Sequence, residues 1–147
     1  MTAILFDIDG VVYQGEAALP GAGETLEWVR REGIPHLFLT NTTSRPRSAI
    51  VEKLAGLGMT VREEEILSPP VAAGSWLAQR GISRAALFVP AATRGEFGGI
   101  EDLPPDRETG AGAVILGDLG EGWDFATLNR AFRLLMAEPR PYLIALG

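Results

Sequence analysis

The sequence predicts an α/β fold built around a parallel β-sheet. Short apolar runs of two to five residues alternate along the chain with longer segments whose apolar residues recur at helical spacing. The short runs are continuously apolar rather than alternating, which is typical of strands buried on both faces of a parallel sheet. Glycine or proline follows most of the helical segments. Parallel strands need crossover connections, and a strand–helix order supplies them.

The first half of the chain is predicted to run strand, helix, strand, helix, strand, helix. Ser44 is the expected N-cap of the second helix, with Pro46 just inside it. A glycine follows each helical segment, where glycine commonly ends a helix. The expected strands are 4–6, 36–39 and 66–67, and the expected helices are about 22–32, about 46–57 and about 71–80.

The second half is less regular. Residues 90–112 are rich in glycine, proline and acidic residues, with one short helix expected near 94–97. The expected strands are 85–89, 113–116 and 142–146. Asp124 is the expected N-cap of a helix over 125–138, whose inner face is predicted to hold Leu128, Ala131, Phe132 and Leu135. We place a domain boundary near residue 80, giving domains 1–80 and 81–147.

Composition excludes several classes of protein. The chain has 147 residues and a net charge of −6, which argues against nucleic acid as a general partner because phosphate backbones need clustered Lys and Arg. Cysteine is absent, so neither disulfides nor thiolate metal sites are expected. No apolar run approaches the roughly 20 residues that span a bilayer, and no signal peptide is recognisable. We therefore expect a cytoplasmic protein without a membrane partner.

Two carboxylates directly follow the first predicted strand. Asp7 and Asp9 are spaced by one residue, and Gly10 comes next. In open parallel sheets ligands bind beyond the carboxyl ends of the strands, so both acids are expected to face a cleft. Paired carboxylates there can bind Mg2+, and one can attack an electrophile while the other moves protons. The alternative is a plain Asp-Gly turn at a strand end; Gly10 fits both, because it allows close approach of a ligand.

A hydroxyl and an amide follow the second predicted strand. If the two strands are neighbours, Thr40 and Asn41 lie beside Asp7. Such groups can hydrogen-bond phosphate oxygens and hold them for in-line attack. The alternative is that residues 40–44 only cap the following helix.

These motifs resemble those of a known family. Asp-Ile-Asp-Gly-Val-Val-Tyr at 7–13, with the downstream Leu39-Thr40-Asn41, resembles the haloacid dehalogenase (HAD) superfamily of phosphatases. Residues 19–22, 66–69 and the segment with Ser44 and Arg47 resemble its NagD-like branch. Within that branch, residues 126–147 are similar to the phospholysine phosphohistidine inorganic pyrophosphate phosphatases and their bacterial relatives.

The resemblance implies a HAD-like Rossmannoid parallel sheet with an inserted α/β cap. Asp7 would be the nucleophile that forms an aspartyl-phosphate, and Asp9 the general acid and base. Mg2+ would bind the Asp7 carboxylate and the Asp9 backbone carbonyl. Thr40 would bind the transferring phosphoryl group, supported by Asn41, with Gly10 at the phosphate site. Residues 1–80 would form the first part of the catalytic core and 81–147 part of the cap, through which relatives commonly pair as homodimers.

Two family features are missing from the chain. The family needs a lysine after the second motif, but Lys53 is the only lysine, and it is better explained as a solvated helix residue. A late acidic motif is also needed, and the apolar run that ends at Gly117-Asp118 is better explained as a cap strand. We therefore expect a sequence truncated within the cap and weak in catalysis alone, with unpaired sheet edges.

The predicted function is Mg2+-dependent hydrolysis of small phosphorylated metabolites, with phosphoamides or pyrophosphate among the candidates. One alternative is a noncatalytic fragment or interaction module. Another is a receiver-like domain that accepts phosphate on an aspartate. A receiver would need an aspartate at the end of a central strand, and no aspartate lies between Asp9 and Asp102.

Overall fold

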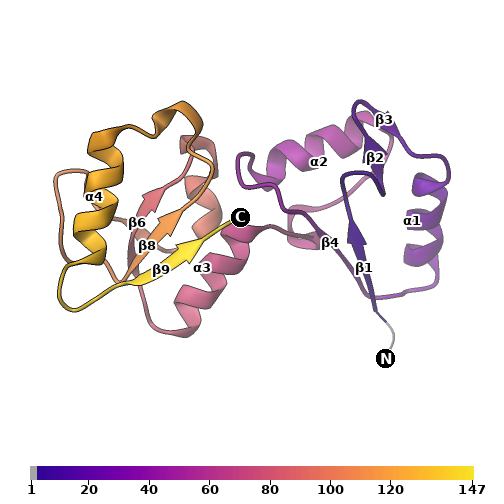
Figure 1. Ribbon diagram of the computed structural model, residues 1–147. Coiled ribbons are helices and arrows are strands. Elements are labelled where there is room, and N and C mark those ends of the chain that lie inside the picture. Colours follow the sequence, from indigo (N-terminus) through magenta and orange to yellow (C-terminus); the bar gives the residue numbers. More distant parts are fainter. Residues whose placement is uncertain (1–2) are drawn as a thin grey trace. The chain divides into compact units, whose positions relative to one another are not determined.

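The computed structural model describes residues 3–147, which form two compact units. The first unit comprises residues 3–41 and 47–68, and the second comprises residues 42–46 and 69–147. Each unit has its own parallel sheet (Figure 1). The α/β fold with parallel sheets is therefore confirmed. No helix within residues 3–147 is long and apolar enough to cross a membrane.

The first unit is built on a three-stranded parallel sheet of order β1-β4-β5. Its strands are β1 (Ile4–Asp7), β4 (His36–Leu39) and β5 (Ile66–Leu67). Between β1 and β4 the chain forms a small hairpin and a helix. The remaining elements of the unit are β2 (Tyr13–Gln14), β3 (Ala17–Ala18), α1 (Ala22–Arg31), α2 (Arg47–Gly56) and the 3-10 helix η1 (Glu63–Glu65).

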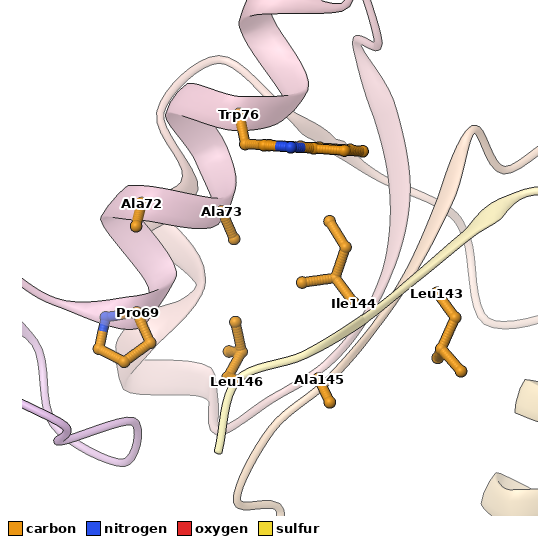
Figure 2. Close-up of a pocket in the computed structure, with 8 residues that line it drawn as sticks. All are labelled: Pro69, Ala72, Ala73, Trp76, Leu143, Ile144, Ala145 and Leu146. Carbon is orange, nitrogen blue, oxygen red and sulfur yellow. The ribbon is translucent and has the colours of Figure 1, made fainter.

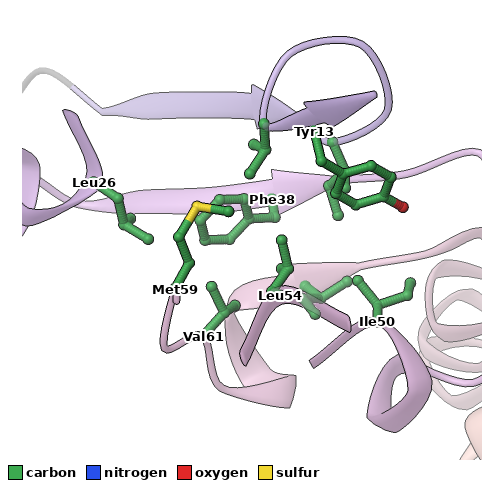
Figure 3. Close-up of a cluster of buried hydrophobic side chains, with 10 residues drawn as sticks. Tyr13, Leu26, Phe38, Ile50, Leu54, Met59 and Val61 are labelled. Atoms are coloured by element: carbon green, nitrogen blue, oxygen red, sulfur yellow. The ribbon is translucent and has the colours of Figure 1, made fainter. Parts of the chain in front are cut away.

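One face of this sheet carries the core of the first unit. Phe38 of β4 lies at its centre, with Leu26 of α1 and Leu54 of α2 packed against it (Figure 3). Strand residues alternate between faces, so Leu5 and Leu37 lie on the opposite face, where both are exposed. The other buried members of the cluster are Ile8, Val12, Tyr13, Ile50, Met59, Val61 and Ile66.

The second unit has a four-stranded parallel sheet of order β7-β6-β8-β9. Its strands are β6 (Arg84–Phe88), β7 (Glu101–Asp102), β8 (Ala113–Leu116) and β9 (Tyr142–Ala145). Both faces are covered, which explains the continuously apolar runs in β6 and β8. The other elements are α3 (Pro69–Gln79), α4 (Phe125–Leu135) and the 3-10 helices η2 (Ala91–Phe97) and η3 (Gly120–Gly122).

Two apolar clusters hold these layers together. On one face, Leu77 of α3 and Phe97 of η2 pack against Leu87 of β6. On the other face, Leu134 of α4 packs against Val114 of β8. The sheet therefore lies between α3 and α4 (Figure 1).

Two local predictions were wrong, one of them only in part. α2 begins at Arg47, after Pro46, so Ser44 lies too far upstream to be its N-cap residue. The inner face of α4 holds Ala131, Leu134 and the half-buried Leu135, so the prediction is confirmed for Ala131 and Leu135. Leu128 and Phe132, also expected there, are exposed. The helix is apolar on two sides, and spacing alone does not tell which side packs.

The division into units differs from the expected boundary near residue 80. α3 belongs to the second unit because its buried residues Ala73 and Leu77 pack against that unit's sheet. Besides residues 42–46, the second unit begins at Pro69, directly after Ser68 of the first unit. Proline is well suited to this place because its fixed φ favours the first turn of a helix.

Candidate active site

The acid pair lies at the carboxyl end of β1. Asp7 is the last residue of the strand and is exposed, and its Oδ1 accepts a hydrogen bond from the backbone N–H of Ile8 at 2.9 Å. That bond orients the carboxylate. Within residues 3–147 nothing else hydrogen-bonds to Asp7 or pairs with its charge, so the second oxygen, Oδ2, can meet a ligand.

A tight turn positions Asp9. The N–H of Val12 donates to the Ile8 carbonyl at 2.9 Å, and the N–H of Gly10 donates to the Tyr13 carbonyl at 2.7 Å. Gly10 has φ 80°, in the left-handed region that side chains disfavour. Its amide is already engaged, so Gly10 can serve a ligand by close approach rather than as a donor. Asp9 also forms a bridge with Tyr13 and is exposed.

Thr40 and Asn41 directly follow β4. β1 and β4 are parallel neighbours, and Asp7 is in register with Leu39. The two motifs therefore end at the same edge of one sheet, as expected. Thr40 is buried and its N–H donates to the Leu67 carbonyl of β5 at 3.2 Å, whereas Asn41 is exposed.

Lys53 lies in α2, as expected, but it is less solvated than expected. Its side chain is only 21% exposed, and its ammonium group pairs with Glu16 at 3.2 Å and lies 4.2 Å from the centre of the Tyr13 ring. It packs against the hairpin that follows the acid pair rather than extending into solvent. Nothing in the sequence pattern links Lys53 to Glu16, 37 residues away.

The donors at this edge suit a hard cation. Mg2+ prefers oxygen ligands and is commonly bound by one or two carboxylates, with waters and substrate phosphate completing the shell. Asp7 and Asp9 are such a pair. Within residues 3–147 no group of three or more acidic or histidine side chains is placed to hold a metal, so an all-protein metal cage is not present in this part of the chain.

Comparison with known proteins assigns the family. Residues 4–97 match the model of the haloacid dehalogenase-like hydrolases, a match that spans both motifs. The chain belongs to the haloacid dehalogenase-like hydrolase family. This confirms the resemblance drawn from the acid pair and Thr40-Asn41.

Several proteins are similar to this chain. The phospholysine phosphohistidine inorganic pyrophosphate phosphatase of Bos taurus is 35% identical over 98% of the chain and 52% of its own length. A glycerol phosphate phosphatase of Mycobacterium tuberculosis, solved in complex with magnesium, matches with a TM-score of 0.78 and 26% sequence identity. The match covers 97% of this chain and 43% of that protein's chain. A hypothetical protein of Pyrococcus horikoshii OT3 shares the fold, with a TM-score of 0.89 and 24% sequence identity. The match covers 100% of this chain and 58% of that protein's chain. The chain spans about half the length of the curated relatives it matches.

The second unit also has a strand that ends near an aspartate. Asp118 follows β8, which belongs to the sheet of the second unit and not to the sheet of β1 and β4. The sequence therefore correctly set the segment 113–118 apart from the acid pair.

Sequence analysis missed one polar group near the candidate site. Ser68 directly follows β5, at the same sheet edge as Asp7 and Thr40, and is only 3% exposed. Within residues 3–147 its hydroxyl has no hydrogen-bond partner. Buried hydroxyl groups are nearly always hydrogen-bonded, so this one is unusual. The sequence analysis gave Ser68 no role beyond its place in the segment 66–69 that resembles the NagD-like branch.

A separate groove lies in the second unit between α3 and β9. It encloses about 500 Å³, and its lining is apolar. Figure 2 shows Trp76 of α3 projecting across it toward Ile144 of β9. No titratable side chain lines it, so it offers no acid, base or metal ligand. The remaining lining residues are Pro69, Ala72, Ala73, Leu143, Ala145 and Leu146.

Proposed function

We propose that this chain carries the phosphoryl-transfer residues of a Mg2+-dependent phosphohydrolase. The observation that carries the proposal is the parallel pairing of β1 with β4, with Asp7 opposite Leu39. It supports an arrangement in which an acidic attacker and a neutral phosphate-binding pair share one edge. Phosphoryl transfer depends mainly on positioning and charge neutralisation, which this arrangement supplies.

Asp7 is the proposed nucleophile. The hydrogen bond from Ile8 to Oδ1 leaves Oδ2 for in-line attack on phosphorus. A new P–O bond forms to Asp7 as the bond to the leaving oxygen breaks, giving an aspartyl-phosphate. Water then attacks this phosphorus, phosphate leaves, and Asp7 is regenerated. The covalent step divides one difficult displacement into two easier ones.

Asp9 is the proposed general acid and base. Its position two residues after Asp7, fixed by the turn through Gly10, is the support for this role. Protonated Asp9 gives its proton to the leaving oxygen in the first step. As a carboxylate it takes a proton from the attacking water in the second step.

Thr40 and Asn41 are the proposed phosphate ligands, and Gly10 leaves room for the phosphate. The Thr40 hydroxyl and the Asn41 amide would donate hydrogen bonds to the phosphoryl oxygens that stay bonded to phosphorus throughout the transfer. Mg2+ would bind the Asp7 carboxylate and the Asp9 backbone carbonyl, where it would neutralise charge on the phosphoryl group. The relative solved with magnesium supports this choice of ion.

Small phosphorylated metabolites are the proposed substrates. The names of the similar phosphatases support phosphoamides, inorganic pyrophosphate and glycerol phosphate as the first compounds to assay. We also propose a cytoplasmic location and a homodimer formed through residues 81–147.

The test measures phosphate release from these compounds by the natural full-length polypeptide, with and without Mg2+. Asp7→Asn is expected to abolish turnover. Asp9→Asn is expected to slow it by about 100- to 10,000-fold, as for loss of a general acid and base. Asp118→Asn is the matched control, an exposed aspartate after a strand of the other sheet, and is expected to keep full activity. Full turnover in Asp7→Asn would exclude Asp7 as the nucleophile.

A noncatalytic interaction module is the second candidate. Two observations favour it: the only lysine packs on the hairpin through Glu16, and no third acidic ligand joins the acid pair within residues 3–147. Undetectable phosphate release from every compound, with Mg2+ present and the fold intact, would support this candidate.

A further inference from the structure

Ser68 and Thr40 occupy matching positions on neighbouring strands of the first unit. Leu67 of β5 is in register with Leu39 of β4, and each strand is followed directly by one of these two hydroxyl residues. The Thr40 N–H donates to the Leu67 carbonyl at 3.2 Å, so the parallel pairing continues one step past the strand ends. Neighbouring strands lie roughly 4.8 Å apart, and Ser68 therefore lies next to Thr40 along the sheet edge.

The side chains of Ser68 and Thr40 point to the same face of the sheet. Burial alternates in step along residues 38–40 and 66–68: the first pair is buried, the second pair is more exposed, and the third pair is buried again. Successive strand residues point to opposite faces, so this shared alternation places Thr40 and Ser68 on one face. At the spacing of neighbouring strands, two hydroxyl side chains can hydrogen-bond directly to each other.

The Ser68 hydroxyl lacks a hydrogen-bond partner within residues 3–147, although the residue is buried. Burial of a hydroxyl without a hydrogen bond costs free energy. Proteins break local rules of this kind chiefly at functional sites, where the broken rule serves a role. We therefore expect the hydroxyl to gain its partner in a functional state of the site at this sheet edge.

Capping of α3 does not use this hydroxyl. Ser68 directly precedes α3, and a serine at that place commonly accepts a hydrogen bond from the second or third N–H of the helix. The second helical residue is Pro70, which has no N–H to donate. The third is Val71, and no group of residues 3–147 donates to the Ser68 Oγ. The hydroxyl is therefore available to Thr40.

A phosphoryl group bound to Thr40 would create the state in which the Ser68 hydroxyl gains its partner. A hydroxyl donates one hydrogen bond and accepts up to two. When the Thr40 hydroxyl donates to a phosphoryl oxygen, its own oxygen keeps lone pairs that can accept from the Ser68 O–H. The two bonds then form a chain from Ser68 through Thr40 to the phosphoryl oxygen, and bonds in such a chain strengthen one another.

We propose that Ser68 is a positioning residue for phosphate that acts through Thr40. Its hydroxyl donates to the Thr40 hydroxyl when phosphate is bound, and so directs the Thr40 proton toward the phosphoryl oxygen. This role rests on the proposed function, because it takes Thr40 as a phosphate ligand. Ser68 does not touch the phosphoryl group that Asp7 attacks, since in the order β1-β4-β5 it lies two strands from Asp7, roughly 10 Å away.

Phosphate binding by the natural full-length polypeptide tests this role. The probe is inorganic phosphate with Mg2+ present, and calorimetry measures its dissociation constant. Ser68→Ala is expected to weaken binding about 3- to 10-fold, the effect of one neutral hydrogen bond. Ser68→Thr keeps the hydroxyl and is expected to bind as the unaltered protein does. Without phosphate, Ser68→Ala is expected to unfold at the same urea concentration as the unaltered protein or at a higher one. Circular dichroism checks the fold of each variant.

A double-mutant cycle tests the route through Thr40. Thr40→Val is expected to weaken phosphate binding roughly 10- to 100-fold, because a hydrogen bond to a charged group is lost. In that background Ser68→Ala is expected to have no further effect, since Ser68 acts on phosphate only through Thr40. Thr93→Val is the matched control, because Thr93 is a buried hydroxyl residue of the other unit that donates to the Pro90 carbonyl at 3.1 Å. It is expected to lower stability and to leave the phosphate dissociation constant unchanged.

Several results would overturn this role for Ser68. They are unchanged phosphate binding in Ser68→Ala, equally weak binding in a folded Ser68→Thr, the same loss from Ser68→Ala with and without the Thr40 hydroxyl, and a comparable loss in Thr93→Val. Lower stability of Ser68→Ala without phosphate would also overturn it, because the hydroxyl would then have a partner in the absence of the ligand. Unchanged binding in Thr40→Val would instead contradict the proposed function at Thr40, and this role with it.

Discussion

At the scale of single residues, the Glu65 carboxylate ties together two parts of the first unit. It accepts hydrogen bonds from the Arg62 backbone N–H at 2.8 Å, from the Arg62 guanidinium at 3.1 Å and from Arg30 of α1 at 3.2 Å. Its side chain is only 10% exposed, and the His36 Nε2 lies 3.6 Å away. The 3-10 helix η1 therefore contains a buried anchor.

Glu65→Ala is expected to lower the free energy of unfolding by about 2 kcal/mol, because several charge-assisted hydrogen bonds are lost at once. Glu64→Ala is the control. Glu64 pairs with the same Arg62 at 3.1 Å but is 71% exposed, and exposed pairs contribute about 0–1 kcal/mol. Urea unfolding measures both, and equal losses would contradict the anchoring role of Glu65.

Two buried hydroxyl groups make a matched comparison. Thr93 donates to the Pro90 carbonyl at 3.1 Å and is fully buried, whereas the buried Ser68 hydroxyl has no partner within residues 3–147. Thr93→Val is expected to lower the free energy of unfolding by about 1 kcal/mol, since a hydrogen bond is lost. Ser68→Ala is expected to leave it unchanged or to raise it, because an unsatisfied polar group is removed. Destabilisation by Ser68→Ala would show that its hydroxyl is hydrogen-bonded after all, for example to water.

The candidate site could be predicted from sequence because its residues lie in two short, contiguous runs. Asp7, Asp9, Thr40 and Asn41 each follow an apolar strand directly, and strand ends of a parallel sheet meet at one edge. The environment of Lys53 could not be predicted. Its partner Glu16 lies on a hairpin whose strands are only two residues long, too short to show a period of two.

At the scale of secondary-structure elements, α3 and η2 approach each other at Gly74. A Cβ built on Gly74 would lie 2.7 Å from the backbone oxygen of Phe97, closer than real contacts allow. Gly74→Ala is therefore expected to force the two elements apart and to destabilise the protein by about 1–3 kcal/mol. Gly56→Ala is the control, because Gly56 lies in α2 and nothing stands within 4 Å of its added Cβ. That change is expected to be neutral or stabilising by up to about 1 kcal/mol. The close approach would be excluded if both variants unfolded at the same urea concentration.

The N-cap of α4 predicts a pH dependence. Asp124 accepts a hydrogen bond from the Thr127 N–H at 2.7 Å, and this bond lowers the pKa of Asp124 below its usual value of 3.8. The carboxylate therefore adds stability above that usual value, and the contribution is lost as pH falls through the lowered pKa. Asp124→Ala is expected to lower the urea midpoint at neutral pH and to have little effect in strong acid.

Asp106→Ala is the control for this prediction, since Asp106 is exposed and no hydrogen bond to its side chain is present within residues 3–147. It is expected to leave the urea midpoint unchanged at both pH values. A constant effect of Asp124→Ala across the pH range would mean that its carboxylate does not cap the helix.

The elements themselves were largely predictable, and their packing was less so. Four-residue apolar strands and helices with a cap or a stop residue have strong local signals, as at Asp124. The predicted inner face of α4 was wrong for Leu128 and Phe132, because the helix has two apolar rows and only tertiary packing selects the one that is buried. Strands of two residues, such as β7, carry no periodic signal at all.

At the scale of the whole molecule, the chain divides its apolar residues between separate cores. Leu54 is fully buried in the core of the first unit, and Leu77 is fully buried in the second. The sequence predicted two domains because strand and helix signals change character along the chain. The sequence could not show to which unit α3 belongs, since a helix between two sheets in the chain can pack on either one. It also could not give the strand order, which depends on long-range pairing.

Separate cores predict separable stability. Leu54→Ala leaves a cavity where Phe38 and Ile50 pack, at an expected cost of about 2–5 kcal/mol. Native-state hydrogen exchange is expected to accelerate in α1, α2 and β4, with the protection of β6, β8 and α4 unchanged.

Leu77→Ala is the reciprocal variant, a change of the same size and burial in the other core. It is expected to accelerate exchange in α3, β6 and β8 and to leave β4 protected. Local and global opening differ in which amides exchange faster together. The two variants therefore show whether the two units open independently. If either variant accelerated exchange equally in both units, the two cores would form one cooperative unit, and a defect in the second unit would then weaken the edge that carries Asp7 and Thr40.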